Sequence, residues 1–207
     1  QARAILDDNN TQGGRVQALI SNLPRDGSLI ERLQRGDLFA QLRYRGPAQS
    51  LWRLAAIDLL DFSGPVAIAA DVRGTLERPR VRGSLSSDDL RVQSAISGTD
   101  IRDASVRGDF AGSRLRINSF KGTAPNGGAV NGSGVVDLKN LGAGRGPEID
   151  IRAGARNAQL VDARGLKATV TGPLRIVSNG SGGTIAGRLA VNRASWKLGV
   201  GAETTKI

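Results

Sequence analysis

The sequence predicts an all-β, mainly antiparallel fold with one short amphipathic helix. From residue 65 onward, apolar residues alternate with polar ones, the period of strands with one buried face. The apolar residues are chiefly Val, Ile, Leu and Ala, since the 207 residues include only two Trp, one Tyr and four Phe. Small branched side chains suit thin β layers. The 28 glycines have no Gly-X-Y period and therefore indicate tight turns and bends.

The first 45 residues form a β-rich segment in this prediction. Residues 1–24 alternate as two strands that are broken at residues 9–14. Ser28 and Glu31 have the spacing of a capping box, which predicts a short helical turn that ends at Gly36. Residues 38–45 alternate again and predict another strand.

Residues 46–64 differ from their surroundings and predict an amphipathic helix. Gly46 and Pro47 place a proline in its first turn, and Gly64 with Pro65 ends it. One apolar stripe recurs at helical spacing, and we expect it to pack on a sheet edge or to cover one end of the core. The stripe consists of Leu51, Trp52, Ala55, Ala56, Leu59 and Leu60.

Residues 65–207 predict a long antiparallel meander, continuous with the preceding segments in one elongated domain. We expect turns at Ser87–Asp89, Ser97-Gly98, Asn126–Gly128 and Asn179-Gly180. Open sheets of this size curl or fold over. The alternation leaves two possibilities open, a packed sandwich core and a trough for an apolar ligand. Glycines within the strands indicate the bends or bulges at which the sheet curves.

Composition excludes several classes of function. The chain has no Cys, His or Met, which excludes disulfides, thiol catalysis and imidazole chemistry. The net charge is +10, but the arginines are dispersed and no run of five basic residues occurs, so we expect no nucleic-acid partner. Asp88-Asp89 and Asp58 with Asp61 lack the spacing of a metal site. We expect no catalytic residue, metal, cofactor or membrane-spanning helix in these residues.

Several phrases of the sequence resemble the TamB family of translocation and assembly module subunits, which is AsmA-like and related to bridge-like lipid transport proteins. The phrases include Gly74-Thr75-Leu76 followed by Pro79, Gly132-Ser133-Gly134 followed by Val135, and Thr171-Gly172-Pro173-Leu174. The resemblance is best over residues 46–195, and it identifies the chain as an internal or C-terminal-half piece of such a protein.

The resemblance implies a fold and a role. Proteins of this family are anchored in the inner membrane of Gram-negative bacteria and cross the periplasm, so this piece would be periplasmic. Their body is a curled, β-taco-like sheet with a hydrophobic groove. They support assembly of outer-membrane proteins and autotransporters, and phospholipid transport between the membranes. The implied partners are phospholipid acyl chains or outer-membrane-protein strands in the groove, and the barrel TamA, through regions outside this piece.

The predicted groove residues are the apolar members of the alternating runs. A structural or adhesive β-solenoid with a filled core is the alternative, and an enzyme on a β scaffold is disfavoured because no carboxylates cluster. The expected groove residues are Val66, Ile68, Val81, Leu85, Val106, Phe110, Leu115, Ile117, Val136, Leu138, Val170, Leu174, Ile185 and Leu189.

Overall fold

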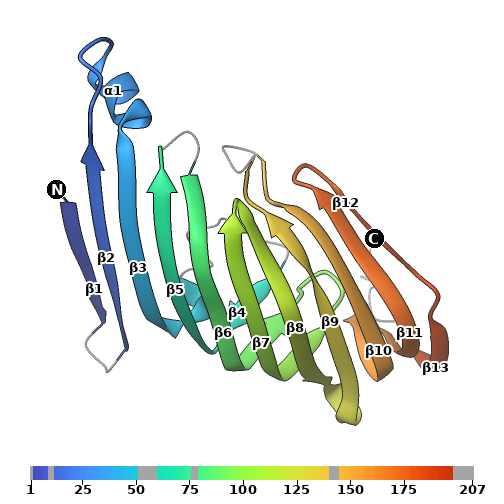
Figure 1. Cartoon of the computed structure of the whole chain (residues 1–207). Coiled ribbons are helices and arrows are strands. Elements are labelled where there is room, and N and C mark those ends of the chain that lie inside the picture. The colour runs from blue at the N-terminus through green and yellow to red at the C-terminus, as the bar shows by residue number, and fades with distance from the viewer. Residues whose placement is uncertain (1, 9–11, 51–59, 76–78, 140–144, 198–207) are drawn as a thin grey trace, which may run out of the picture.

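The computed structural model describes residues 2–8, 12–50, 60–75, 79–139 and 145–197. Their strands form one 13-stranded antiparallel sheet that does not close into a barrel (Figure 1). Neighbouring strands along the sheet follow one another in the chain, except that β4 pairs with β6 and β13 pairs with β11. The predicted meander is therefore confirmed. The strands are β1 (Ala2–Asp8), β2 (Gln12–Ser21), β3 (Asp37–Pro47), β4 (Asp61–Ser63), β5 (Pro65–Gly74), β6 (Pro79–Gln93), β7 (Asp100–Gly112), β8 (Arg114–Ala124), β9 (Gly128–Asp137), β10 (Glu148–Ala163), β11 (Leu166–Asn179), β12 (Gly183–Gly187) and β13 (Ala190–Trp196).

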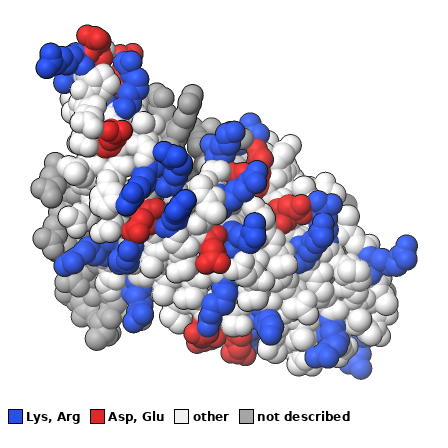
Figure 2. Space-filling view, viewed as in Figure 1, with Lys and Arg blue, Asp and Glu red and all other residues white. Residues whose placement is uncertain are grey.

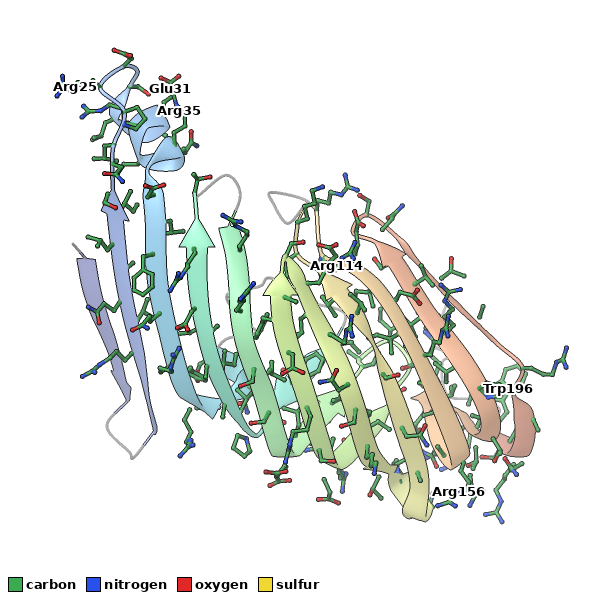
Figure 3. All side chains as sticks on the ribbon, viewed as in Figure 1. Arg25, Glu31, Arg35, Arg114, Arg156 and Trp196 are labelled. Carbon is green, nitrogen blue, oxygen red and sulfur yellow. The ribbon has the colours of Figure 1, made fainter. Side chains whose placement is uncertain are left out.

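The predicted helical turn after residue 28 is present as α1 (Leu29–Arg35). Its capping box is complete, because the Ser28 hydroxyl accepts from the Glu31 backbone N–H and the Glu31 carboxylate accepts from the Ser28 backbone N–H. Gly36 follows the last helical residue and donates its N–H to the Arg32 carbonyl. Figure 3 shows Arg25, Glu31 and Arg35 together at this tip of the molecule.

The second predicted helix has narrower bounds than residues 46–64. Gly46 and Pro47 are the last residues of β3, where they pair with Val66 and Pro65. Helical residues begin at 48–50, and residues 61–63 form β4. The apolar stripe lies outside the described residues except for Leu60, which has no regular structure. The prediction extended the helix too far because Pro47 in a first turn and Pro47 at a strand end look alike in sequence.

A second correction concerns Ser87–Asp89, which the sequence places in a turn. These residues lie inside β6, where the pairing with β7 shifts register between Ser87 and Leu90. The Ser87 hydroxyl is buried and donates a 2.6 Å hydrogen bond to the Pro65 carbonyl. The polar Ser-Asp-Asp run therefore lies at a β-bulge. The bulge leaves both carboxylates exposed while the strand continues.

The sheet curls upon itself. In Figure 1 the strands bend at the lower edge of the view, and β4 lies behind the front layer. The turn between β6 and β7 reaches across to the end of β10 and bypasses β8 and β9. Thr99 donates its hydroxyl to the Leu160 carbonyl at 2.6 Å, and Asp162 donates its N–H to the Ser97 carbonyl at 2.7 Å. We call these contacts between residues 97–99 and 160–162 the hairpin clasp.

Candidate functional site, the apolar inner face

The strand register places the predicted groove residues on one face. Residues directly opposite each other in an antiparallel pair share a face. Ile68 lies opposite Leu85, and Leu115 lies opposite both Phe110 and Val136. The same connections extend across β10 to β11 and β12, so all but Leu138 and Leu189 lie within strands on this inner face. Leu138 directly follows β9, and Leu189 lies between β12 and β13.

One part of the inner face, here the packed half, forms a closed core. Its members are mostly small, and Ala104 and Ala158 are completely buried. Of the predicted residues it contains Val66, Val106 and Val170, with Ile68, Leu85 and Ile117 packed against it. Leu160 of the hairpin clasp packs against this core. The core cluster consists of Tyr44, Ala48, Val66, Leu90, Ile101, Ala104, Val106, Ala124, Ala155, Ala158 and Val170.

The rest of the inner face, here the open half, lies outside this core cluster within the described residues. Its side chains are half-buried and are not part of the core cluster or packed against it. The predicted residues Val81, Phe110, Leu115, Val136 and Leu174 lie here. The open half consists of Val72, Val81, Phe110, Leu115, Val136, Ile149, Ile151, Leu174 and Ile176.

The last two predicted residues lie at the carboxy-terminal edge. Ile185 and Leu189 keep 73% and 39% of their surfaces exposed. Ile185 lies opposite Ile176 and so continues the open half to β12.

The prediction missed two groups on this face. Ile149 and Ile151 of β10 alternate as clearly as the predicted residues and lie opposite Val136 and Gly134. Tyr44 of β3 lies opposite Ile68 and joins the core, where its hydroxyl donates to the Pro47 carbonyl at 2.8 Å. The alternation of residues 38–44 was the available signal for Tyr44.

Glycines on the inner face lie beside large side chains. Gly83 pairs with Phe110, and Gly134 lies between Ile117 and Ile151. A Cβ on Gly83 would collide with the Ala69 carbonyl, and one on Gly134 would lie 2.7 Å from the Ile151 Cα. These glycines therefore allow close backbone approach. Gly83 lies beside no register shift, whereas Gly134 pairs with Ile117 at the edge of the register shift between Ile117 and Phe120 of β8.

The opposite, outer face is charged. Figure 2 shows Lys and Arg side chains interspersed with Asp and Glu across it. Asp71 binds Arg43 at 3.0 Å, and Asp150 binds Arg175 at 2.7 Å, both across strands. Hydrogen bonds from Arg175 lower the pKa of Asp150. The two faces therefore differ as predicted for a one-sided sheet.

Two carboxylates of the outer face are strongly stabilised in their charged forms. Two hydrogen bonds from Arg91, supported by Arg102, lower the pKa of Asp100 to about 2 against an opposing effect of burial. Hydrogen bonds from Arg114, Ser113 and the Lys139 backbone N–H lower the pKa of Asp137 to about 2. These pairings are structural, because each carboxylate is already saturated by cationic or hydrogen-bonding partners.

Two hollows of the described residues contain none of the predicted groove residues. A hollow of about 370 Å³ is lined by residues 102–103 and 123–127. Another of about 360 Å³ is lined largely by charged residues and includes Ile149 from the inner face. Within the described residues, no three potential metal-ligating side chains cluster, and no helix is long and apolar enough to cross a membrane.

Comparison with known proteins gives one match. The family model of the TamB C-terminal domain matches residues 118–206, which begin within β8 and include β9 to β13. No curated protein and no solved structure matches the chain significantly. The matched strands carry part of the open half and the whole carboxy-terminal edge of the sheet. The resemblance to the TamB family is therefore confirmed over residues 118–206, which match the C-terminal domain of that family.

Proposed function

We propose that this chain is a periplasmic part of a translocation and assembly module subunit and that its open half holds the acyl chains of phospholipids in transit. The observation that carries the proposal is the continuous apolar inner face, of which one half lies outside the core cluster within the described residues. The match to the TamB C-terminal domain supports the same role.

Acyl chains suit this surface physically. Binding them requires apolar area, at about 0.8 kcal/mol for each CH₂ group removed from water. A cargo that slides needs few deep pockets and few hydrogen-bonding anchors. The open half offers Val, Leu, Ile and Phe side chains. The glycines between them have no side chain that would project from this face.

The wider role follows from the family. We propose that the chain supports outer-membrane protein and autotransporter assembly, that its parent is anchored in the inner membrane, and that the outer-membrane barrel TamA is its partner. The division into residues 1–45, 46–64 and 65–207 also stays a prediction, although one sheet includes strands from the first and the last of these segments.

The packed half favours a second candidate, a structural scaffold with a filled core. Ala104 and Ala158 have no exposed surface, and Leu160 of the hairpin clasp packs against their cluster. A scaffold would need no cargo, and in that case the open half would be covered by neighbouring protein.

Native mass spectrometry followed by solvent extraction and lipid analysis tests the proposal. We expect co-purifying phospholipid, which Leu115→Asp combined with Val136→Asp removes while circular dichroism shows the fold intact. Ser133→Asp combined with Val135→Asp is the matched control, because it adds the same charge to the outer face of β9. Lipid-free protein that excludes lipophilic dyes and melts cooperatively would support the scaffold.

A further inference from the structure

The carboxy-terminal edge of the sheet exposes large apolar side chains. Ile185, Val191 and Trp196 keep 73%, 63% and 70% of their surfaces exposed, and Leu166 keeps 42%. Leu166, the first residue of β11, lies directly opposite Trp196, the last residue of β13. Isolated exposed apolar residues are ordinary, but several of them along one edge of a sheet indicate an interaction surface.

The same edge carries cations without acidic residues. The sequence has no Asp or Glu between Asp162 and Glu203. Of the basic residues in that interval, Lys167 pairs with Asp162 and Arg175 with Asp150. The other four form no ion pair within the described residues, and they are Arg164, Arg188, Arg193 and Lys197.

The backbone brings the cations to the apolar group. Lys197 donates its N–H to the Gly165 carbonyl at 3.0 Å, which places the end of β13 beside the turn that contains Arg164. The side chains of Trp196 and Leu166 lie next to this turn. Figure 3 shows Trp196 at this edge, with Arg156 at the same end of the molecule and Arg114 toward the other end.

We propose that the edge formed by β11, β12 and β13 docks on a bilayer surface that carries anionic phospholipid headgroups. An indole at the boundary of apolar and polar regions, with aliphatic residues beside it and unpaired cations around it, fits the headgroup layer. An acidic protein would satisfy the cations but would leave the exposed Ile185, Val191 and Trp196 without a matched apolar surface. This inference concerns the exposed edge strands, where Ile185 alone of these apolar residues adjoins the open half, and it goes beyond the proposed binding of cargo there.

Fluorescence of Trp196 tests the docking. In the 207-residue chain with Trp52→Phe, Trp196 is the single Trp. We expect its emission to shift to the blue with vesicles of phosphatidylcholine and phosphatidylglycerol, and to stay unchanged with phosphatidylcholine alone. Affinity should fall steeply with added salt, because the attraction acts between exposed charges.

Charge-reversal variants test whether vesicle binding depends on this edge. Arg164→Glu, Arg193→Glu and Lys197→Glu together should weaken vesicle binding by about a hundredfold. Arg15→Glu, Arg45→Glu and Arg80→Glu make the same change of charge at exposed positions of β2, β3 and β6, and should weaken it far less. Leu115→Asp with Val136→Asp should dock normally, which separates docking from cargo binding.

Three results would overturn the proposal. Equal binding to neutral and anionic vesicles would show that the cations do not contribute to docking. Equal losses in both charge-reversal variants would show attraction by net charge alone. Capture of a polyglutamate peptide in place of anionic vesicles would identify the edge as a protein interface.

Discussion

The packed half and the open half of the inner face lie on the same strands, yet they differ in side-chain size and in cover. The packed half is rich in alanine, and Leu160 of the hairpin clasp packs against it. The open half carries Val, Leu, Ile and Phe side chains that, within the described residues, belong to no core cluster. Small residues allow two layers to approach closely, whereas large residues leave apolar area for another occupant. Alternation therefore determines the face, and distant contacts determine whether the face is closed.

The largest expected difference between the halves concerns a buried charge. Ala158→Asp should lower the free energy of unfolding by at least about 3 kcal/mol, since its carboxylate would replace a methyl group with no exposed surface. Val136→Asp in the open half should cost less than about 1.5 kcal/mol. Urea denaturation at pH 7 measures both. Similar losses would mean that the open half is closed in solution.

Two glycine substitutions on β9 test how closely the neighbouring backbones approach the inner face. Gly134→Ala should lower the free energy of unfolding by about 2 kcal/mol, because its Cβ would collide with the Asp150 carbonyl and lie 2.7 Å from the Ile151 Cα. Gly132→Ala is the matched variant, since its closest contact is 3.0 Å from the Arg152 carbonyl oxygen. We expect it to cost under about 1 kcal/mol. The same urea titration compares them.

Acid should weaken the fold through one carboxylate near each half. The lowered pKa values of Asp100 and Asp137, about 2, lie below the usual 3.8. Their ion pairs therefore stabilise the fold fully above pH about 4 and lose effect as the pH falls toward 2. After allowance for solvent screening, we expect a loss of about 1 kcal/mol per group. Asp100→Asn and Asp137→Asn should each reduce this acid sensitivity in thermal melts between pH 5 and 2, and an acid sensitivity equal to that of the unchanged protein would contradict the prediction.

The smallest expected effect concerns the hairpin clasp. Thr99→Val keeps the side-chain shape and removes the donor to the Leu160 carbonyl, at a cost of about 1 kcal/mol. Hydrogen exchange at the Asp162 amide, which donates to the Ser97 carbonyl, should become faster. Thr123→Val on the exposed surface of β8 is the control. Unchanged exchange at Asp162 would show that the clasp contributes nothing to closing the packed half.

The sequence predicts the meander and its apolar face well, because every strand except β4 and β13 follows the order of the chain along the sheet. Alternation then places Val66, Phe110 and Ile185 on one face without knowledge of distant contacts. The capping box at Ser28 is equally local, and the helix after it forms as predicted.

The division into packed and open halves could not be predicted in this way. It depends on the contact of Ser97 and Thr99 with residues beyond β8 and β9, which no local pattern encodes. The bulge at Ser87 escaped prediction for a related reason, because its hydroxyl is satisfied by the Pro65 carbonyl of the neighbouring strand β5. The composition of the core cluster is the available signal for the packed half, since five of its members are alanines.

The hairpin clasp also has a consequence for the order in which the protein folds. Neighbouring strands of the meander close short loops, so they can form as the chain emerges. Thr99 meets Leu160 across 61 residues, with β7, β8, β9 and most of β10 between them. Closing so long a loop is entropically costly until those strands are in place. The sheet should therefore grow strand by strand, and the closure of its alanine-rich core should be a late event that waits for β10.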